Sequence, residues 1–309
     1  MSLMESSGRA AERLKSKCGV RMRGWACWLI LFAFVSDLSH GQQAVVSASS
    51  QERAPVSWVQ AAARNQAAIV QGAVTTSLRF RQRKADAKGD TTREIIESKQ
   101  GGVARLVERD GKPITAAEDA AERDRLQASL ASPDEFLRHH RHDKESRQYA
   151  LDLIQQMPSA MIYSYAPDQP QPSGATSRQI VLDFQPDPKY HPPTMIADLL
   201  TGLAGRMWID AASERLTRAE CHVVKPVNIG WGMVGRIYPG GTMQFGQADA
   251  GGGLWVYTHL EEHVTVREMM VRTVPFNVVM TSTEFRVLPS LLSYQDAIHV
   301  LLAEKIPLR

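Results

Sequence analysis

The stretch Leu203-Ala-Gly-Arg-Met-Trp-Ile-Asp-Ala-Ala-Ser-Glu-Arg-Leu-Thr-Arg-Ala-Glu-Cys-His-Val223 decides the fold class. Two strand-like runs flank a polar turn at 211–214, and the same pattern continues to residue 287. Turns recur at roughly 8–12 residues, a spacing typical of all-β regions. Because short turns join successive strands, we expect antiparallel meander pairing and not βαβ crossovers. The further strands are expected at 229–238, 242–247, 254–260, 264–272 and 276–286.

Helical patterns surround this meander. They are predicted near 57–71, 115–157, 194–203 and 290–304, and Thr115 with Glu118 forms a capping-box signature. Two extended runs, 73–83 and 91–109, are expected to form a hairpin around a turn at 87–90. A large sheet has one face to bury, and the few helices are its natural cover. We therefore predict an α+β fold with a large antiparallel sheet.

The N-terminal 41 residues are typical of an export signal. A basic stretch, Lys15–Arg23, precedes an apolar core, Trp25–Val35, which is shorter than the roughly 20 residues of a membrane-spanning helix. We predict a signal peptide over 1–41, a linker over 42–56 and a single β-rich domain over 57–309, exported to the periplasm or the extracellular space. Cleavage after Gly41 or Ala48, and initiation at Met22, all remain open.

Charge argues against nucleic-acid binding. The chain has 36 Lys and Arg against 33 Asp and Glu, but the predicted signal peptide holds six of the basic and three of the acidic residues. The remainder is formally neutral, whereas binding to phosphate backbones needs concentrated positive charge. We therefore expect no nucleic-acid partner.

The catalytic and cofactor motifs are weak. Gly230–Gly235 matches G-x-G-x-x-G, but strand-like residues follow where dinucleotide binding requires a helix. His259-Leu-Glu-Glu-His263 matches H-x-x-E-H, whose zinc chemistry requires both His on one helical face. In a strand, positions four apart are separated by about 13 Å. An exposed polar turn is the preferred interpretation, with His259 and His263 as weak metal candidates. We predict no catalytic residues and no cofactor.

Aromatic side chains concentrate in the meander. Such residues fill the core under a sheet or line a cavity. The candidates for lining a ligand cavity are Trp208, Trp231, Tyr238, Trp255 and Tyr257.

The order of elements resembles the periplasmic lipoprotein-carrier family, whose members localise outer-membrane lipoproteins. The segments that carry the resemblance are Leu203–Asp210 with Leu216 and Arg218 after the turn, Gly232–Gly240 and Gly253–Tyr257. The resemblance implies that the large antiparallel sheet is curved into an incomplete barrel and covered by a few helices over an apolar cavity. The helices at 115–157 are longer than this family leads us to expect.

Export, a one-sided sheet and aromatic strands together favour a non-enzymatic envelope protein. We expect it to bind an apolar or amphipathic ligand, a lipid or acyl chain, in the concave face of the sheet. Its partners would be a lipid, a lipoprotein or another envelope protein. Two alternatives stay open: a secreted hydrolase, metal-dependent through His259 and His263, and a structural or docking module.

Overall fold

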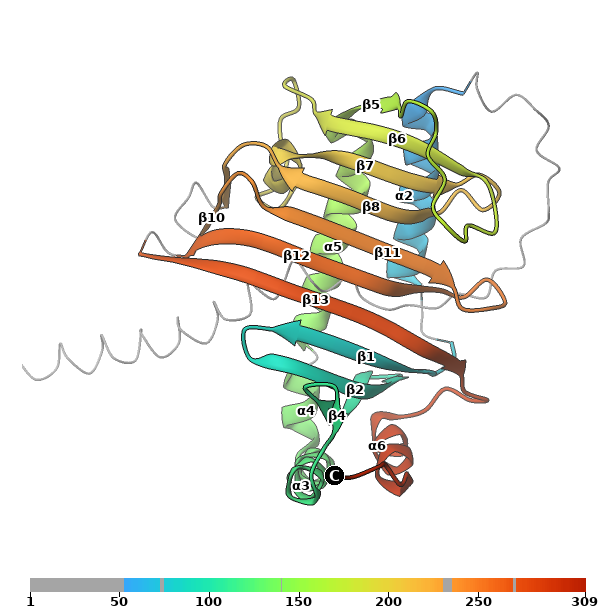
Figure 1. Cartoon of the computed structure of the whole chain (residues 1–309), viewed down its shortest axis with the longest axis vertical. Coiled ribbons are helices and arrows are strands. Elements are labelled where there is room, and N and C mark those ends of the chain that lie inside the picture. Colours follow the sequence, from blue (N-terminus) through green and yellow to red (C-terminus); the bar gives the residue numbers. More distant parts are fainter. Residues whose placement is uncertain (1–52, 73–74, 140, 230–234, 269–270) are drawn as a thin grey trace, which may run out of the picture.

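The computed structural model describes residues 53–72, 75–139, 141–229, 235–268 and 271–309. The predicted signal peptide, most of the predicted linker and Trp231 lie outside these residues. The fold is α+β, as predicted: the described residues form a large antiparallel sheet of 13 strands that does not close into a barrel (Figure 1).

The main path of the sheet runs β4-β3-β2-β1-β13-β12-β11-β8-β7-β6-β5, and β9 and β10 extend it beside β12. The strands are β1 (Leu78–Asp86), β2 (Gly89–Ser98), β3 (Gly101–Arg109), β4 (Lys112–Pro113), β5 (Met161–Tyr165), β6 (Gln179–Pro186), β7 (Leu203–Asp210), β8 (Leu216–Val223), β9 (Val227–Ile229), β10 (Gly235–Ile237), β11 (Thr242–Asp249), β12 (Trp255–Glu268) and β13 (Arg272–Val287).

Five α-helices and one 3-10 helix are described. They are α2 (Pro55–Gln71), α3 (Ala116–Ala131), α4 (Pro133–His139), α5 (Arg141–Ala160), η1 (Ala197–Gly202) and α6 (Tyr294–Ala303). Helix α2 starts two residues earlier than predicted because Pro55 occupies a first-turn position, where its missing N–H removes no helical hydrogen bond. The region predicted as helical over 115–157 contains three helices, and the region over 194–203 forms only the short η1.

Two strand predictions were wrong in detail. The run 91–109 is not one strand, because the chain turns between Ser98 and Gly101 and returns as β3. Gly101 has φ of 135°, a conformation that favours glycine. The exposed polar turn predicted at His259–His263 is also absent, since β12 runs unbroken from Trp255 to Glu268 and pairs with β13 along most of its length.

The helices divide the sheet into two covered regions (Figure 1). Helices α2 and α5 pack on each other and lie across the face formed by β5–β8 and β11–β12. Helices α3 and α6 pack on β2 and β3 at the other end of the sheet. The capping box of Thr115 and Glu118 is confirmed at the start of α3. The long α5, which starts beside α4 and ends at β5, spans most of the sheet.

Candidate functional site

A cavity of about 540 Å³ lies between helices α2 and α5 on one side and the sheet on the other. Helices α2 and α5 and the segment 194–203 line one side, and β7, β8, β11, β12 and β13 line the other. Its volume falls within the roughly 300–1,000 Å³ that is typical of small-molecule sites. Met195 lines the cavity and is also 47% exposed, so it marks the rim where solvent meets the apolar interior.

Strand periodicity explains the sheet side of the cavity. Successive side chains of a strand point to opposite faces, so alternate residues share one face. On β8 the lining residues Ala219, Cys221 and Val223 alternate in this way, and on β12 so do Leu260, Glu262, Val264 and Val266.

Helix periodicity supplies the opposite wall. Ala150, Leu153, Ile154 and Met157 recur at helical spacing on α5, and all four line the cavity. The same face of α5 packs against α2. The apolar stripe of α5 is therefore divided between a packed contact with a helix and an open space over the strands.

The lining is largely aliphatic. Besides the residues of α5, β8 and β12 already named, its apolar members include Ala62, Met161, Phe184, Ile196, Leu199, Leu200, Leu203, Met207, Leu216, Val227, Ile229, Ile237, Met243, Phe245 and Phe276. Most polar lining residues carry no charge at neutral pH, namely Gln66, Ser146, Tyr149, Thr194 and Gln244. The surface is therefore suited to an apolar chain.

Glu262 is an exception in this apolar wall. Its side chain is 1% exposed, and its Oε2 atom has no hydrogen-bond partner among the described residues. The residues paired with it across β12 are Met243 on β11 and Val278 on β13. Because burial disfavours the charged form, the pKa of the Glu262 carboxyl rises to about 7, although the positive charge of Lys84 acts in the opposite direction.

Cys221 lies in the same row of the sheet. Met243 pairs with Glu262 on one side and with Cys221 on the other. Burial, together with the negative charge of Glu262, raises the pKa of the Cys221 thiol to about 12. Because the thiolate is the reactive form, this raised pKa makes Cys221 a poor nucleophile at neutral pH.

Of the predicted aromatic residues, Trp231 lies outside the described residues, and the other four are not among the residues that line the cavity. Trp208 packs against Ala166 and Val181, and its indole N–H donates to the Pro170 carbonyl over 3.0 Å. It borders a second, more polar depression that Arg206 and Arg218 also line. Met207, its neighbour on β7, is the residue that reaches the cavity.

The other aromatic candidates take separate positions. Tyr238 lies beside the Arg236 guanidinium, and Trp255 beside that of Arg215. Tyr257 comes closest to the predicted role of a cavity-lining residue, because its ring packs edge-on against Phe245, which lines the cavity. Its hydroxyl accepts a 2.7 Å hydrogen bond from Gln66 of α2, another lining residue.

The two candidate metal ligands, His259 and His263, lie on an exposed row of β12. Glu261 between them contacts both: its carboxylate is 2.8 Å from Nε2 of His263 and 3.4 Å from Nε2 of His259. Hydrogen bonds to Asn277 and Glu261 raise the pKa of His263. Within the described ranges no group of three or more His, Cys, Asp or Glu is arranged to hold a metal ion.

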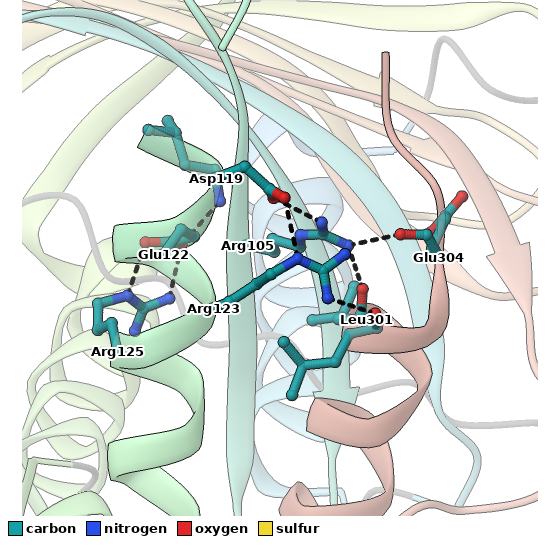
Figure 2. A network of polar contacts seen from close by, with 9 residues as sticks. Arg105, Asp119, Glu122, Arg123, Arg125, Leu301 and Glu304 are labelled. Carbon is teal, nitrogen blue, oxygen red and sulfur yellow. Dashed lines mark hydrogen bonds and ion pairs between the residues drawn. The ribbon is translucent and has the colours of Figure 1, made fainter. Parts of the chain in front are cut away.

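A second polar cluster lies at the far end of the sheet (Figure 2). Arg105 of β3 is 1% exposed and donates to Asp119 of α3 over 2.7 Å and to the Glu304 carbonyl over 3.0 Å; it also donates to the Leu301 carbonyl. Arg123 donates to the other oxygen of Asp119. These bonds fasten α6 to α3 and β3, which is a structural role.

Sequence analysis missed Glu262 as a site residue. The signal was the series Leu260, Glu262, Val264 and Val266, in which one carboxyl interrupts an apolar stripe at strand spacing. Interpreting residues 260–262 as a turn concealed it, because a turn would have exposed the carboxyl to water.

Comparisons with known proteins give no relative. No protein-family model, no curated protein and no solved structure matches the chain. Among the helices of the described residues, none combines the length and apolar composition needed to cross a membrane.

Proposed function

We propose that this protein is a non-enzymatic binder of an apolar or amphipathic ligand, a lipid or acyl chain, in the cavity between α5 and the sheet. The observation that carries the proposal is the apolar lining of a space of about 540 Å³. Empty apolar space forfeits packing contacts, so filling it with an apolar chain is favourable.

The proposal extends to the cellular setting. Residues 1–41 favour export to the periplasm or the extracellular space, and the resemblance to lipoprotein carriers favours a lipid, a lipoprotein or an envelope protein as the partner. An exported binder would keep an apolar chain out of water between two membranes or between a membrane and a protein. The cavity supports this role because its rim at Met195 is open to solvent.

Native mass spectrometry before and after organic extraction tests the proposal. We expect the purified protein to retain a lipid-sized mass that extraction removes, and the extracted protein to bind a neutral fluorescent acyl probe. A clean apoprotein mass together with no probe binding would refute the function.

A matched pair of variants locates the binding. Ala219→Phe puts a ring into the cavity from β8, whereas Ala248→Phe adds the same ring at an exposed position of β11. We expect Ala219→Phe to weaken probe binding by at least about tenfold, which corresponds to 1.4 kcal/mol, and Ala248→Phe to leave it unchanged. Equal binding by both variants would place the ligand elsewhere. Far-ultraviolet circular dichroism establishes that each variant is folded.

A further inference from the structure

The charge of the cavity wall indicates which polar head group the ligand carries. Two charged side chains line the cavity among the described residues, Asp152 and Glu262, and both are acidic. The same described lining contains no Lys, Arg or His. An anionic head group would therefore meet like charge in a medium of low dielectric constant, which is unfavourable.

Glu262 lies deep in the cavity and Asp152 lies nearer the solvent. Asp152 accepts a 2.9 Å hydrogen bond from Gln148 in an exposed part of α5. Glu262 instead has an unpartnered oxygen, within a residue that is 1% exposed. A buried carboxyl without a partner is destabilising, whereas the same group paired with a cation is compensated.

None of the described groups that face Glu262 supplies a cation to its unpartnered oxygen. The neighbouring strands present Met243, Val278 and, in the same row, the neutral thiol of Cys221. The Lys84 ammonium on β1 is near enough to influence Glu262 but is 3.2 Å from Asp86, with which it forms an ion pair. On α5 the titratable lining residues are Tyr149 and Asp152, neither of which is basic.

We propose that the cavity takes a cationic amphiphile, with its apolar chain between α5 and the sheet and its protonated amine on the free oxygen of Glu262. This inference rests on the proposed function, because it names the head group of the ligand that the cavity binds. The ammonium donates to Oε2 of Glu262, and the chain fills the aliphatic lining. Charge complementarity selects against fatty acids and other anionic lipids of the same chain length.

Three probes of equal chain length test the head-group preference at pH 7.5: dodecylamine, dodecanol and dodecanoate. Each displaces a neutral fluorescent acyl probe from the extracted protein, below its critical micelle concentration. We expect dodecylamine to bind at least about tenfold more tightly than dodecanol, and dodecanoate to bind more weakly than both. An equal or stronger affinity for dodecanoate would overturn the inference.

Glu262→Gln is the matched variant, because it keeps the shape of the side chain and removes its charge. We expect the ratio of amine to alcohol affinity to fall to near one. Glu261→Gln is the control, since Glu261 is the adjacent carboxylate in the exposed row with His259 and His263. It should keep the ratio of the unaltered protein. A ratio that survives Glu262→Gln, or falls equally in both variants, would overturn the assignment.

The unaltered protein supplies a second readout that depends on no variant. An alkyl amine stays protonated below about pH 10, as lysine does. Between pH 5.5 and 8, ionisation of Glu262 should therefore strengthen dodecylamine binding, while dodecanol binding stays nearly constant. A flat amine profile would refute the ion pair. Failure of all three probes and of the neutral probe would refute the proposed function itself, so the two failures are distinguishable.

Discussion

Replacing Glu262 by Gln should change how the stability of the protein depends on pH. The carboxyl has a pKa of 4.5 in the unfolded chain and about 7 in the folded protein. Between these values the unfolded state binds fewer protons than the folded state, so stability falls as the pH rises. The favourable contribution is complete below about pH 4.5 and is lost as the pH passes about 7.

The expected size follows from the two pKa values. Each pH unit between them corresponds to about 1.4 kcal/mol, so the ionisation of Glu262 lowers the free energy of unfolding by about 3 kcal/mol. Glu262→Gln has no such ionisation. Relative to this variant, the unaltered protein should therefore lose about 3 kcal/mol of stability between pH 4.5 and pH 8.

Urea unfolding of extracted protein at closely spaced pH values measures this difference, because the titration of the other residues cancels between the two proteins. The control is Glu261→Gln. Hydrogen bonds from His263 lower the pKa of Glu261, so this carboxylate stabilises the protein at high pH and loses that effect as the pH falls. That loss falls below pH 4.5, so Glu261→Gln should keep most of the fall in stability that the unaltered protein shows between pH 4.5 and 8. A stability difference between unaltered protein and Glu262→Gln that stays constant from pH 4.5 to 8 would refute the reasoning.

Three further predictions concern packing and reactivity. Arg105→Met should destabilise the protein by about 3–5 kcal/mol in urea unfolding, because it leaves buried acceptors of α3 and α6 without a donor. By contrast, the half-exposed ion pair between Arg109 and Glu118 should contribute less than about 1 kcal/mol to the free energy of unfolding. Gly205→Ala should lower the melting temperature, because its Cβ would lie 2.0 Å from a backbone oxygen of β8, while Gly235→Ala, at 3.6 Å, should not. In a protein with the other two cysteines replaced by Ser, alkylation of Cys221 at pH 8 should be about 1,000-fold slower than in urea, since its pKa rises from 9.0 to about 12. Equal rates in the folded and unfolded protein would contradict the raised pKa.

Local patterns predicted the elements because their causes are local. The turn at 211–214 joins β7 and β8 as expected, and Thr115 and Glu118 cap α3 through contacts three residues apart. Such features depend on neighbours in the sequence, which the sequence displays directly. The predicted α+β class followed from counting these elements.

The arrangement of the strands was beyond local patterns. The runs 73–83 and 91–109, expected as a two-stranded hairpin, form three strands. These strands join the meander because β1 pairs with β13, from Leu78 beside Val287 to Ala85 beside Val279. This contact links residues about two hundred positions apart, and no local periodicity specifies it.

Strand periodicity also left the inner face undetermined. Alternation separates Met207 from Trp208 but does not tell which of the two faces the helices. The predicted lining residues were the aromatic side chains of the meander, which fill the core under a sheet or line a cavity. The structure lines it mostly with aliphatic and methionine side chains and with other aromatic residues, such as Phe245 and Phe276, while Trp208 contacts the chain near Pro170. Irregular pairing complicates the alternation further, with register shifts after Gly246 on β11 and after Trp208 on β7.

The cavity lies where helix α5 crosses the sheet without packing on the strands beneath it. Helix α5 packs on α2, on η1 and on β5, so it is held at the edge of the sheet where β5 lies. Over β11 and β12 the same helix faces the sheet across open space, and there the lining residues of α5 and β12 oppose each other. Several side chains that line this space are small or medium in size, such as Ala219 and Val264. A sheet evolved only for stability would close the gap, since each unfilled methylene position lowers stability by about 1 kcal/mol. The gap, with the unpartnered oxygen of Glu262 in its wall, therefore supports the proposal of a bound ligand.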